Sequence, residues 1–294
     1  VVKEATFAKK VDGKRLVPQF TLLFGDQIRV FASYFDRTKN QNFLTVRNFD
    51  PATLEEVGTL QTIGSMTTVQ EAPKVSMSIG ISGVGTGIKA PTNATGKFGY
   101  SISQNQKKLL LFYQKSEATG GYESFTFQVF DAPFVKSWEK SVELPCENER
   151  FTMQEIRVDN GGNSHLVGRE QLSTNGNRPE NYAYRLLSWY QQGETITDYR
   201  LALPEGNRAT DLQLACSEEG VLICAGFYTH EKETGIKGTY FLRIDAREKK
   251  VLTRNLEAFS FEFKTQFSSE KEKAKAAQKV KKEKVYNLHQ FQLK

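Results

Sequence analysis

The sequence predicts an all-β fold, a β-propeller built from four-stranded antiparallel sheets, or blades. Three observations lead to this prediction. The 294 residues include 21 Phe and 11 Tyr but only 3 Met, which favours pleated, half-buried surfaces over helix bundles. Short apolar runs alternate with turns rich in Asp, Asn, Gly and Pro. The same order of four strands then recurs along the chain, as in the blades of a propeller.

Four complete blades are expected, at about residues 18–63, 97–145, 150–204 and 210–259. The first unit predicts four strands, at residues 21–24, 28–35, 43–49 and 54–63. The second predicts strands at 98–103, 108–113, 125–130 and 135–145. The third predicts strands at 151–158, 165–168, 184–189 and 195–204. The fourth predicts strands at 212–216, 221–225, 239–244 and 250–259.

The spacing of these units is nearly regular. The turn after the third strand falls at Asp50, Asp131, about Gln191 and Asp245, which gives intervals of 81, about 60 and 54 residues. The long first interval contains a stretch of small residues at 64–96, which predicts an insertion loop. Without this loop the period is in the mid-fifties, so we expect one structural unit repeated four times.

The apolar pattern indicates how the units pack. Phe125, Phe127 and Val129 alternate onto one face of their strand. The second strands, at residues 109–112 and 221–223, are apolar throughout, as expected for strands covered on both faces. A single blade cannot cover both of its own faces, so neighbouring blades must stack. Two sheets packed as a sandwich would give a similar pattern and remain an alternative.

Both ends of the chain predict partial blades. Residues 1–11 suggest the last strand of an earlier blade, and residues 261–267 and 286–294 suggest further strands. These features lead us to expect a single propeller, of which the chain is a fragment. Residues 268–284 differ because they hold seven Lys and three Glu. They predict one short Lys-rich, solvated helix inserted between strands and capped by Ser268 or Ser269.

Charge and hydropathy exclude two classes of partner. The net charge is +6, but the Lys-rich segment alone carries +4, so the rest of the surface is close to neutral. Positive charge confined to one segment without interleaved aromatic residues does not predict a nucleic-acid partner. No apolar run approaches the length of roughly 18 residues that a membrane-spanning helix needs.

The sequence offers no recognisable reactive constellation. His165, His230 and His289 lie in different units and have no further ligand at metal-binding spacing, so no metal is expected. The glycine-rich residues 80–89 lack the GK[ST] ending of a phosphate-binding loop. We therefore predict no cofactor and no catalytic residue, and we expect His165, inside an apolar strand, to be structural.

The cysteines do not predict a disulfide. Cys216 and Cys224 flank a turn, and a hairpin centred there would pair Cys216 with Val221 and Cys224 with Gln213. Alternation then places the two sulfur atoms on opposite faces of the sheet, where they cannot bond.

Polar residues at the ends of the second strands are the candidate ligand-binding residues. If the blades form a ring, these ends meet on the face where the loops between the second and third strands lie. The candidates are Arg37, Lys115, Arg169, Glu170, Tyr228 and His230.

One combination of features suggests a relationship. It consists of the Asp-Asn-Gly-Gly turn at residues 159–162, the Val-Phe-Asp strand end at 129–131, and the 261–267 segment followed by the Lys-rich helix. Over residues 98–294 the chain resembles uncharacterised exported β-propeller-like proteins of Gram-negative bacterial envelopes. The resemblance implies a removed signal sequence and a periplasmic or cell-surface location, without an activity.

Two functions follow from this reading. The first is a non-enzymatic binding or scaffold propeller of the cell envelope that recognises a protein or glycan partner on its loop face. The alternative is a propeller-type polysaccharide hydrolase or lyase that uses residues from several blades. The alternative predicts two carboxyl groups roughly 5–10 Å apart in a central cleft.

Overall fold

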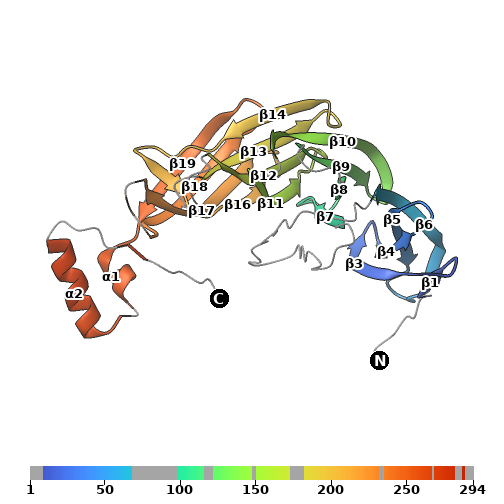
Figure 1. Cartoon of the computed structure of the whole chain (residues 1–294), viewed down its shortest axis with the longest axis horizontal. Coiled ribbons are helices and arrows are strands. Elements are labelled where there is room, and N and C mark those ends of the chain that lie inside the picture. Colours follow the sequence, from blue (N-terminus) through green and yellow to red (C-terminus); the bar gives the residue numbers. More distant parts are fainter. Residues whose placement is uncertain are drawn as a thin grey trace.

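The computed structural model describes residues 9–67, 98–115, 122–147, 150–172, 182–231, 233, 235–266, 268–281 and 287–288. Within this part of the chain, 19 strands and 2 helices form. Seventeen of the strands, β3 to β19, make up four antiparallel sheets that follow one another along the chain, and β1 and β2 form a separate two-stranded sheet (Figure 1). The predicted all-β architecture of four-stranded blades is confirmed.

Blades 1 to 3 are up-and-down sheets in which strands that are neighbours in sequence pair with each other. In blade 4 the position of the first strand is divided between two short strands, β15 and β16, which both pair with β17. Blade 1 contains β3 (Val17–Phe24), β4 (Gln27–Asp36), β5 (Gln41–Phe49) and β6 (Glu56–Thr67). Blade 2 contains β7 (Phe98–Ile102), β8 (Lys108–Lys115), β9 (Tyr122–Asp131) and β10 (Val135–Glu147). Blade 3 contains β11 (Phe151–Val158), β12 (Ser164–Gln171), β13 (Tyr182–Tyr190) and β14 (Thr195–Arg200). Blade 4 contains β15 (Asn207–Ala209), β16 (Gln213–Cys216), β17 (Leu222–His230), β18 (Gly238–Asp245) and β19 (Lys250–Ala258).

The blades stack in series and do not form two layers. One hydrophobic cluster joins blades 1 and 2 and includes Phe31 and Leu109. A second joins blades 2 and 3 through residues such as Phe127 and Trp189, and a third joins blades 3 and 4. Because each inner blade packs on both of its faces, the sandwich alternative does not describe the chain.

The stack curves into an open arc. In Figure 1 the first strands β3, β7, β11 and β16 lie along the concave side, and the fourth strands β6, β10, β14 and β19 lie along the convex side. Contacts of β11 with both β7 and β16 place the first strands of blades 2, 3 and 4 side by side. This is the arrangement in which the first strands of a propeller surround its axis.

Little of the expected partial blades at the two ends lies within the described residues. At the N-terminal end, β1 (Lys10–Val11) and β2 (Lys14–Arg15) form a small hairpin beside β4, and residues 1–8 lie outside the described part. Of residues 286–294 only Asn287 and Leu288 are described, and Leu288 forms a single bridge with Ile236.

The prediction of a strand at residues 261–267 is wrong. Residues 261–265 form a short helix, α1 (Phe261–Thr265), because Ser260 caps its first turn by accepting a hydrogen bond from the backbone N–H of Phe263. The phenylalanines at positions 261 and 263 suit a strand, but Phe263 instead packs on Phe259 with ring centroids 4.5 Å apart.

The Lys-rich helix forms as predicted and is α2 (Glu270–Lys281). Ser269 caps it, since its hydroxyl accepts from the N–H of Glu272 and the Glu272 carboxylate accepts from the N–H of Ser269. Of the predicted insertion loop at 64–96, residues 64–67 belong to β6 and the remainder lies outside the described residues.

The sequence correctly predicted that Cys216 and Cys224 form no disulfide with each other, but it predicted the wrong strand register for them. Cys216 and Cys224 are both free. Their register is one residue away from the predicted one: Cys216 faces Leu222 and Cys224 faces Leu214. A slip of one residue moves a side chain to the other face of a strand, so both cysteines point into the cluster between blades 3 and 4.

Candidate functional site

The six candidate residues all lie toward the end of the blades where β4, β8, β12 and β17 finish, but in separate surroundings. Arg37 is exposed in the turn after β4. Lys115 is the last residue of β8, and its side chain lies outside the described part of the structure.

Arg169 and Glu170 are neighbours in β12, so they point to opposite faces of blade 3. The Arg169 guanidinium lies over the Tyr182 ring, 4.7 Å from its centroid. The Glu170 carboxylate accepts hydrogen bonds from Arg185 at 3.0 Å and from Arg200 at 2.7 Å. These ion pairs join β12, β13 and β14, which gives Glu170 a role in holding its own blade together.

Tyr228 and His230 occupy the end of β17. Tyr228 is only 4% exposed and belongs to the hydrophobic cluster between blades 3 and 4, and this burial raises the pKa of its hydroxyl. His230 is half-buried beside the turn at Gly206. Of the two, His230 is the one with surface available to a partner.

His165 is structural, in agreement with its position in an apolar strand. Its Nδ1 lies 2.9 Å from the Ser188 hydroxyl and its Nε2 lies 3.3 Å from the Asp159 carboxylate. The order Ser–His–Asp is that of a hydrolase triad. All three side chains are buried, with Ser188 and His165 at 0% exposure, so a substrate cannot reach the hydroxyl. The trio cross-links strands inside blade 3.

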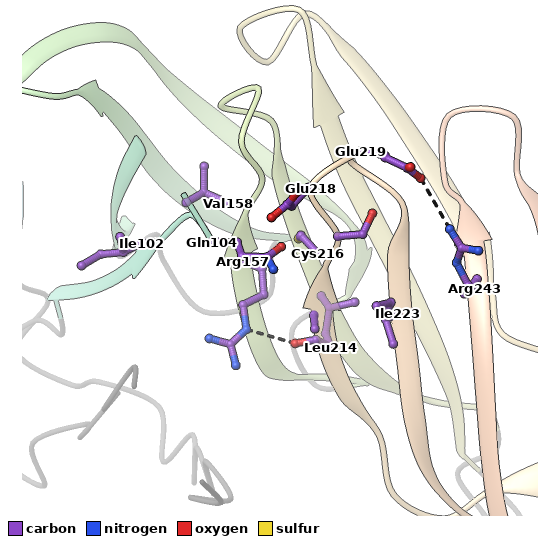
Figure 2. Close-up of a pocket in the computed structure, with 12 residues that line it drawn as sticks. Ile102, Gln104, Arg157, Val158, Leu214, Cys216, Glu218, Glu219, Ile223 and Arg243 are labelled. Atoms are coloured by element: carbon purple, nitrogen blue, oxygen red, sulfur yellow. Dashed lines mark hydrogen bonds and ion pairs between the residues drawn. The ribbon is translucent and has the colours of Figure 1, made fainter. Parts of the chain in front are cut away.

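A groove opens at the opposite end of the blades. It has a volume of about 620 Å³ and crosses the first strands of blades 2, 3 and 4. Figure 2 shows the residues that form its wall around the β16–β17 hairpin. Its lining consists of Ile102, Gln104, Arg157, Val158, Leu214, Ala215, Cys216, Ser217, Glu218, Glu219, Ile223 and Arg243.

Two side chains of blade 3, Glu155 and Arg157, bind the backbone of blade 4 and form the wall of the groove; we call this pair the clamp. Glu155 and Arg157 project from the same face of β11, and their side chains form an ion pair. The Glu155 carboxylate accepts a hydrogen bond from the backbone N–H of Leu214 at 2.8 Å. Arg157 Nε donates to the backbone carbonyl of Leu214 at 3.1 Å, as Figure 2 shows. The edge of β16 at Leu214 is therefore sealed by side chains.

The rim of the groove carries both hydrogen-bond donors and acceptors. Gln104, Glu218 and Glu219 are exposed. Arg243 pairs with Glu219 at 3.5 Å and remains 40% exposed on its side chain. On the wall, burial raises the pKa of the Cys216 thiol to about 12, so Cys216 presents a neutral, weakly polar surface.

Sequence reasoning missed the groove and the clamp. The available signal was the pair of charges at Glu155 and Arg157, two positions apart in a strand whose other face is apolar. Two alternating charges on one strand face indicate that this face meets polar groups. The partner, a backbone peptide of the next blade, could not be read from the pattern.

The described residues contain no cluster of three or more His, Cys, Asp or Glu side chains that could hold a metal ion. Neither helix in the described ranges is long and apolar enough to cross a membrane.

The sequence matches no protein-family model and no curated protein sequence. Similar solved structures include an endo-arabinase from Bacteroides thetaiotaomicron, at 13% identity and a TM-score of 0.31, covering 83% of this chain and 84% of that one. A thermostable family-43 glycoside hydrolase is 9% identical, with a TM-score of 0.33 and coverage of 83% and 74%.

The β-propeller domain of the Trilobed protease from Pyrococcus furiosus is a further similar structure. It is 10% identical, with a TM-score of 0.29 and coverage of 84% of this chain and 71% of that one. Similarity at this level transfers no activity to the chain, so function has to be argued from the groove itself.

Proposed function

We propose that this chain is a glycan-binding propeller, and that an oligosaccharide segment lies in the groove across the first strands of blades 2, 3 and 4. The observation that carries the proposal is the lining of the groove. Its floor contains apolar side chains such as Val158 and Ile223, and its rim mixes guanidinium, amide and carboxylate groups. A few polar groups around an apolar floor are typical of ligand sites.

The sealed strand edge argues against an extended peptide as the ligand. A peptide that adds to a sheet needs free backbone N–H and carbonyl groups at the edge. At Leu214 both groups are already occupied, by Glu155 and Arg157. At this point of the edge, recognition therefore has to come from side chains.

The mixed rim suits hydroxyl groups. Each sugar hydroxyl can both donate and accept a hydrogen bond, so a site for several hydroxyls needs donors and acceptors side by side. Arg243 and Gln104 supply donors, and Glu218 and Glu219 supply acceptors. This balance supports a polyhydroxylated ligand over a purely anionic or purely cationic one.

The test is a binding screen of neutral and acidic oligosaccharides, followed by calorimetry on any that bind. Arg243→Ala should weaken binding about tenfold, since a hydrogen bond to a charged group contributes roughly 1.5–3 kcal/mol. Arg254→Ala is the matched control, because Arg254 is exposed on β19 of the same blade. Binding to no oligosaccharide, or equal binding by both variants, would overturn the proposal.

Hydrolysis or cleavage of the bound polysaccharide is a second candidate function. The observation that favours it is the pair of carboxyl groups that Glu218 and Glu219 place on the rim of the groove. Glycosidases use two carboxyl groups beside the scissile bond, one of them as the acid. Release of reducing ends by the native chain, abolished in the double variant Glu218→Gln, Glu219→Gln, would establish it; binding without release favours the first function.

Two expectations from the sequence stay part of this proposal. The first is a periplasmic or cell-surface location, for which fractionation of expressing cells is the test. The second is contact of a partner with the opposite, loop-bearing end of the blades, where Arg37, Lys115, Arg169 and His230 lie. Arg37→Ala and Arg169→Ala would weaken binding of such a partner and leave oligosaccharide binding in the groove unchanged.

A further inference from the structure

We propose that Glu155 is a positioning residue that fixes Arg157 at the groove wall and makes ligand affinity depend on pH. This inference rests on the proposed glycan-binding function of the same groove. It concerns how the site is controlled, which the lining residues alone do not reveal.

The geometry gives Glu155 its role. One carboxylate oxygen pairs with the Arg157 guanidinium, and the other accepts from Leu214 N–H at 2.8 Å. Arg157 also donates from Nε to the Leu214 carbonyl at 3.1 Å. With these bonds the plane of the guanidinium is held on one side by blade 3 and on the other by blade 4. Fixing a side chain before binding reduces the entropy that the ligand must overcome.

Arg157 can still reach a ligand. It lines the groove, and 24% of its side chain is exposed. Glu155 is not among the lining residues, and its side chain is less exposed, at 18%. Glu155 therefore acts through Arg157, without touching the ligand.

The surroundings of Glu155 explain why its pKa differs from that of an ordinary glutamate. The titratable and charged groups of the described residues that face it are Arg157 on β11, Asp211 before β16, Cys216 on β16 and Cys224 on β17. Burial raises the pKa of Glu155 above its ordinary value of 4.5, and the Arg157 charge and the Leu214 N–H only partly offset this. Asp211 adds to the increase because it carries the same charge.

Protonation of Glu155 should weaken ligand binding. Below its pKa the Glu155 carboxyl becomes neutral and can no longer form an ion pair with Arg157. The guanidinium then loses one of the partners that orient it, and ligand affinity falls. Since the pKa is raised, this loss begins at a higher pH than it would for an ordinary glutamate.

Protonation of Glu155 should stabilise the fold, although it weakens ligand binding. A group with a raised folded-state pKa stabilises the fold at low pH, and this stabilisation is lost as the pH rises through that pKa. The side chain in Glu155→Gln is neutral at every pH, so this variant does not lose the stabilisation as the pH rises. The variant should therefore be at least as stable as the native chain at neutral pH while binding ligand more weakly. A merely structural role predicts that stability and binding fall together.

The experiment compares the native chain, Glu155→Gln and the control Glu257→Gln from pH 4 to pH 8. Glu257 is exposed on β19 and does not line the groove. We expect oligosaccharide affinity of the native chain to fall about tenfold as Glu155 is protonated, and that of Glu155→Gln to be low and independent of pH. Glu257→Gln should keep the native affinity and pH profile. An unchanged profile in Glu155→Gln, or a loss of urea stability in parallel with binding, would overturn the inference.

A second readout needs no ligand. The NMR signal of the Arg157 Nε–H should shift with the protonation of Glu155 in the native chain and stay constant in Glu155→Gln. If no oligosaccharide binds but this shift occurs, the proposed function fails and the positioning role stands. If the Arg157 signal does not respond to Glu155, the positioning role fails whatever the ligand.

Discussion

The Arg29 guanidinium of blade 1 donates a hydrogen bond to the backbone carbonyl of Pro133 in blade 2, across 104 residues of sequence. Arg29 is only 2% exposed, and its guanidinium lies 4.3 Å from the centroid of the Phe134 ring. Nε donates to the Phe24 carbonyl at 3.0 Å, and Nη1 donates to the Asn48 side chain at 2.6 Å. A buried cation with several neutral acceptors thus joins the first two blades.

Replacing Arg29 should weaken the interface between blades 1 and 2. Burial lowers the pKa of Arg29 to about 10, so it is still charged at neutral pH. Arg29→Ala leaves its acceptors without a donor and opens a cavity, and we expect a loss of about 3 kcal/mol or more in urea unfolding. The control Arg254→Ala should change stability by less than about 0.5 kcal/mol. A loss below 1 kcal/mol for Arg29→Ala would show that the interface does not depend on it.

Gly25 should tolerate no side chain, for two reasons that can be separated. Its φ is +58°, and an added Cβ would lie 2.6 Å from Pro133 Cα. Gly13 also has a positive φ, +75°, but an added Cβ there meets nothing within 4 Å. Gly13→Ala should cost only the backbone term of roughly 1–2 kcal/mol. Gly25→Ala should cost clearly more in thermal or urea unfolding; equal costs would mean that the contact with Pro133 is unimportant.

Acid should destabilise blade 3 through Asp159. Burial alone would raise the pKa of this carboxyl, but hydrogen bonds from His165 and Asn163 outweigh burial and hold the pKa below its ordinary value. A lowered pKa gives stability that is present above about pH 4 and lost as the pH falls through the folded-state pKa. Asp159→Asn should therefore be less stable at pH 7 and show a shallower fall in stability between pH 5 and pH 2. Parallel stability curves for the two proteins would contradict this assignment.

Cys216 and Cys224 should resist thiol reagents. Burial raises the pKa of each thiol to about 12, so at pH 8 only roughly one molecule in 10,000 carries the reactive thiolate. In a Cys146→Ser background, the folded protein should react very slowly with a disulfide reagent. Both thiols should react at once after unfolding in urea. Rapid reaction of one thiol in the folded state would show that Cys216 is more accessible than its burial suggests.

The blade order was predictable because it depends on local chemistry. Turn residues such as Asp50, Asp131 and Asp245 mark the same point of each unit, and the strands between them alternate or are apolar throughout. The stacking of blades then follows from the need to cover both faces of each sheet. These are properties of short segments, which the sequence contains in full.

The register of the β16–β17 strand pair and the type of secondary structure at Phe261–Thr265 were harder to predict. The one-residue error at Cys216 arose because the turn closes with the Ser217 N–H donating to the Val221 carbonyl, which moves the pairing by one position. The helix at Phe261–Thr265 was missed because two alternating phenylalanines fit a strand as well as a single helical turn. In this segment the cap at Ser260 decided between the two.

The site could not be predicted because it is made between blades. Arg157 is one charged residue among 40 basic ones in the sequence. Its importance comes from the Leu214 peptide of the next blade, 57 residues away. Such a contact depends on how closely two sheets approach, which the apolar pattern of each sheet does not specify. Conversely, Tyr228 was predicted as a ligand-binding residue and is buried, because its strand end packs into the cluster between blades 3 and 4.

The most direct test of the central claim is to locate a bound oligosaccharide by backbone NMR of the labelled chain during titration. Ligand binding in the groove predicts the largest shifts at Gln104, Arg157, Glu218 and Arg243, with little change at Arg37, Arg169 and His230. Shifts confined to the latter three would place binding at the other end of the blades and contradict the assignment of the groove.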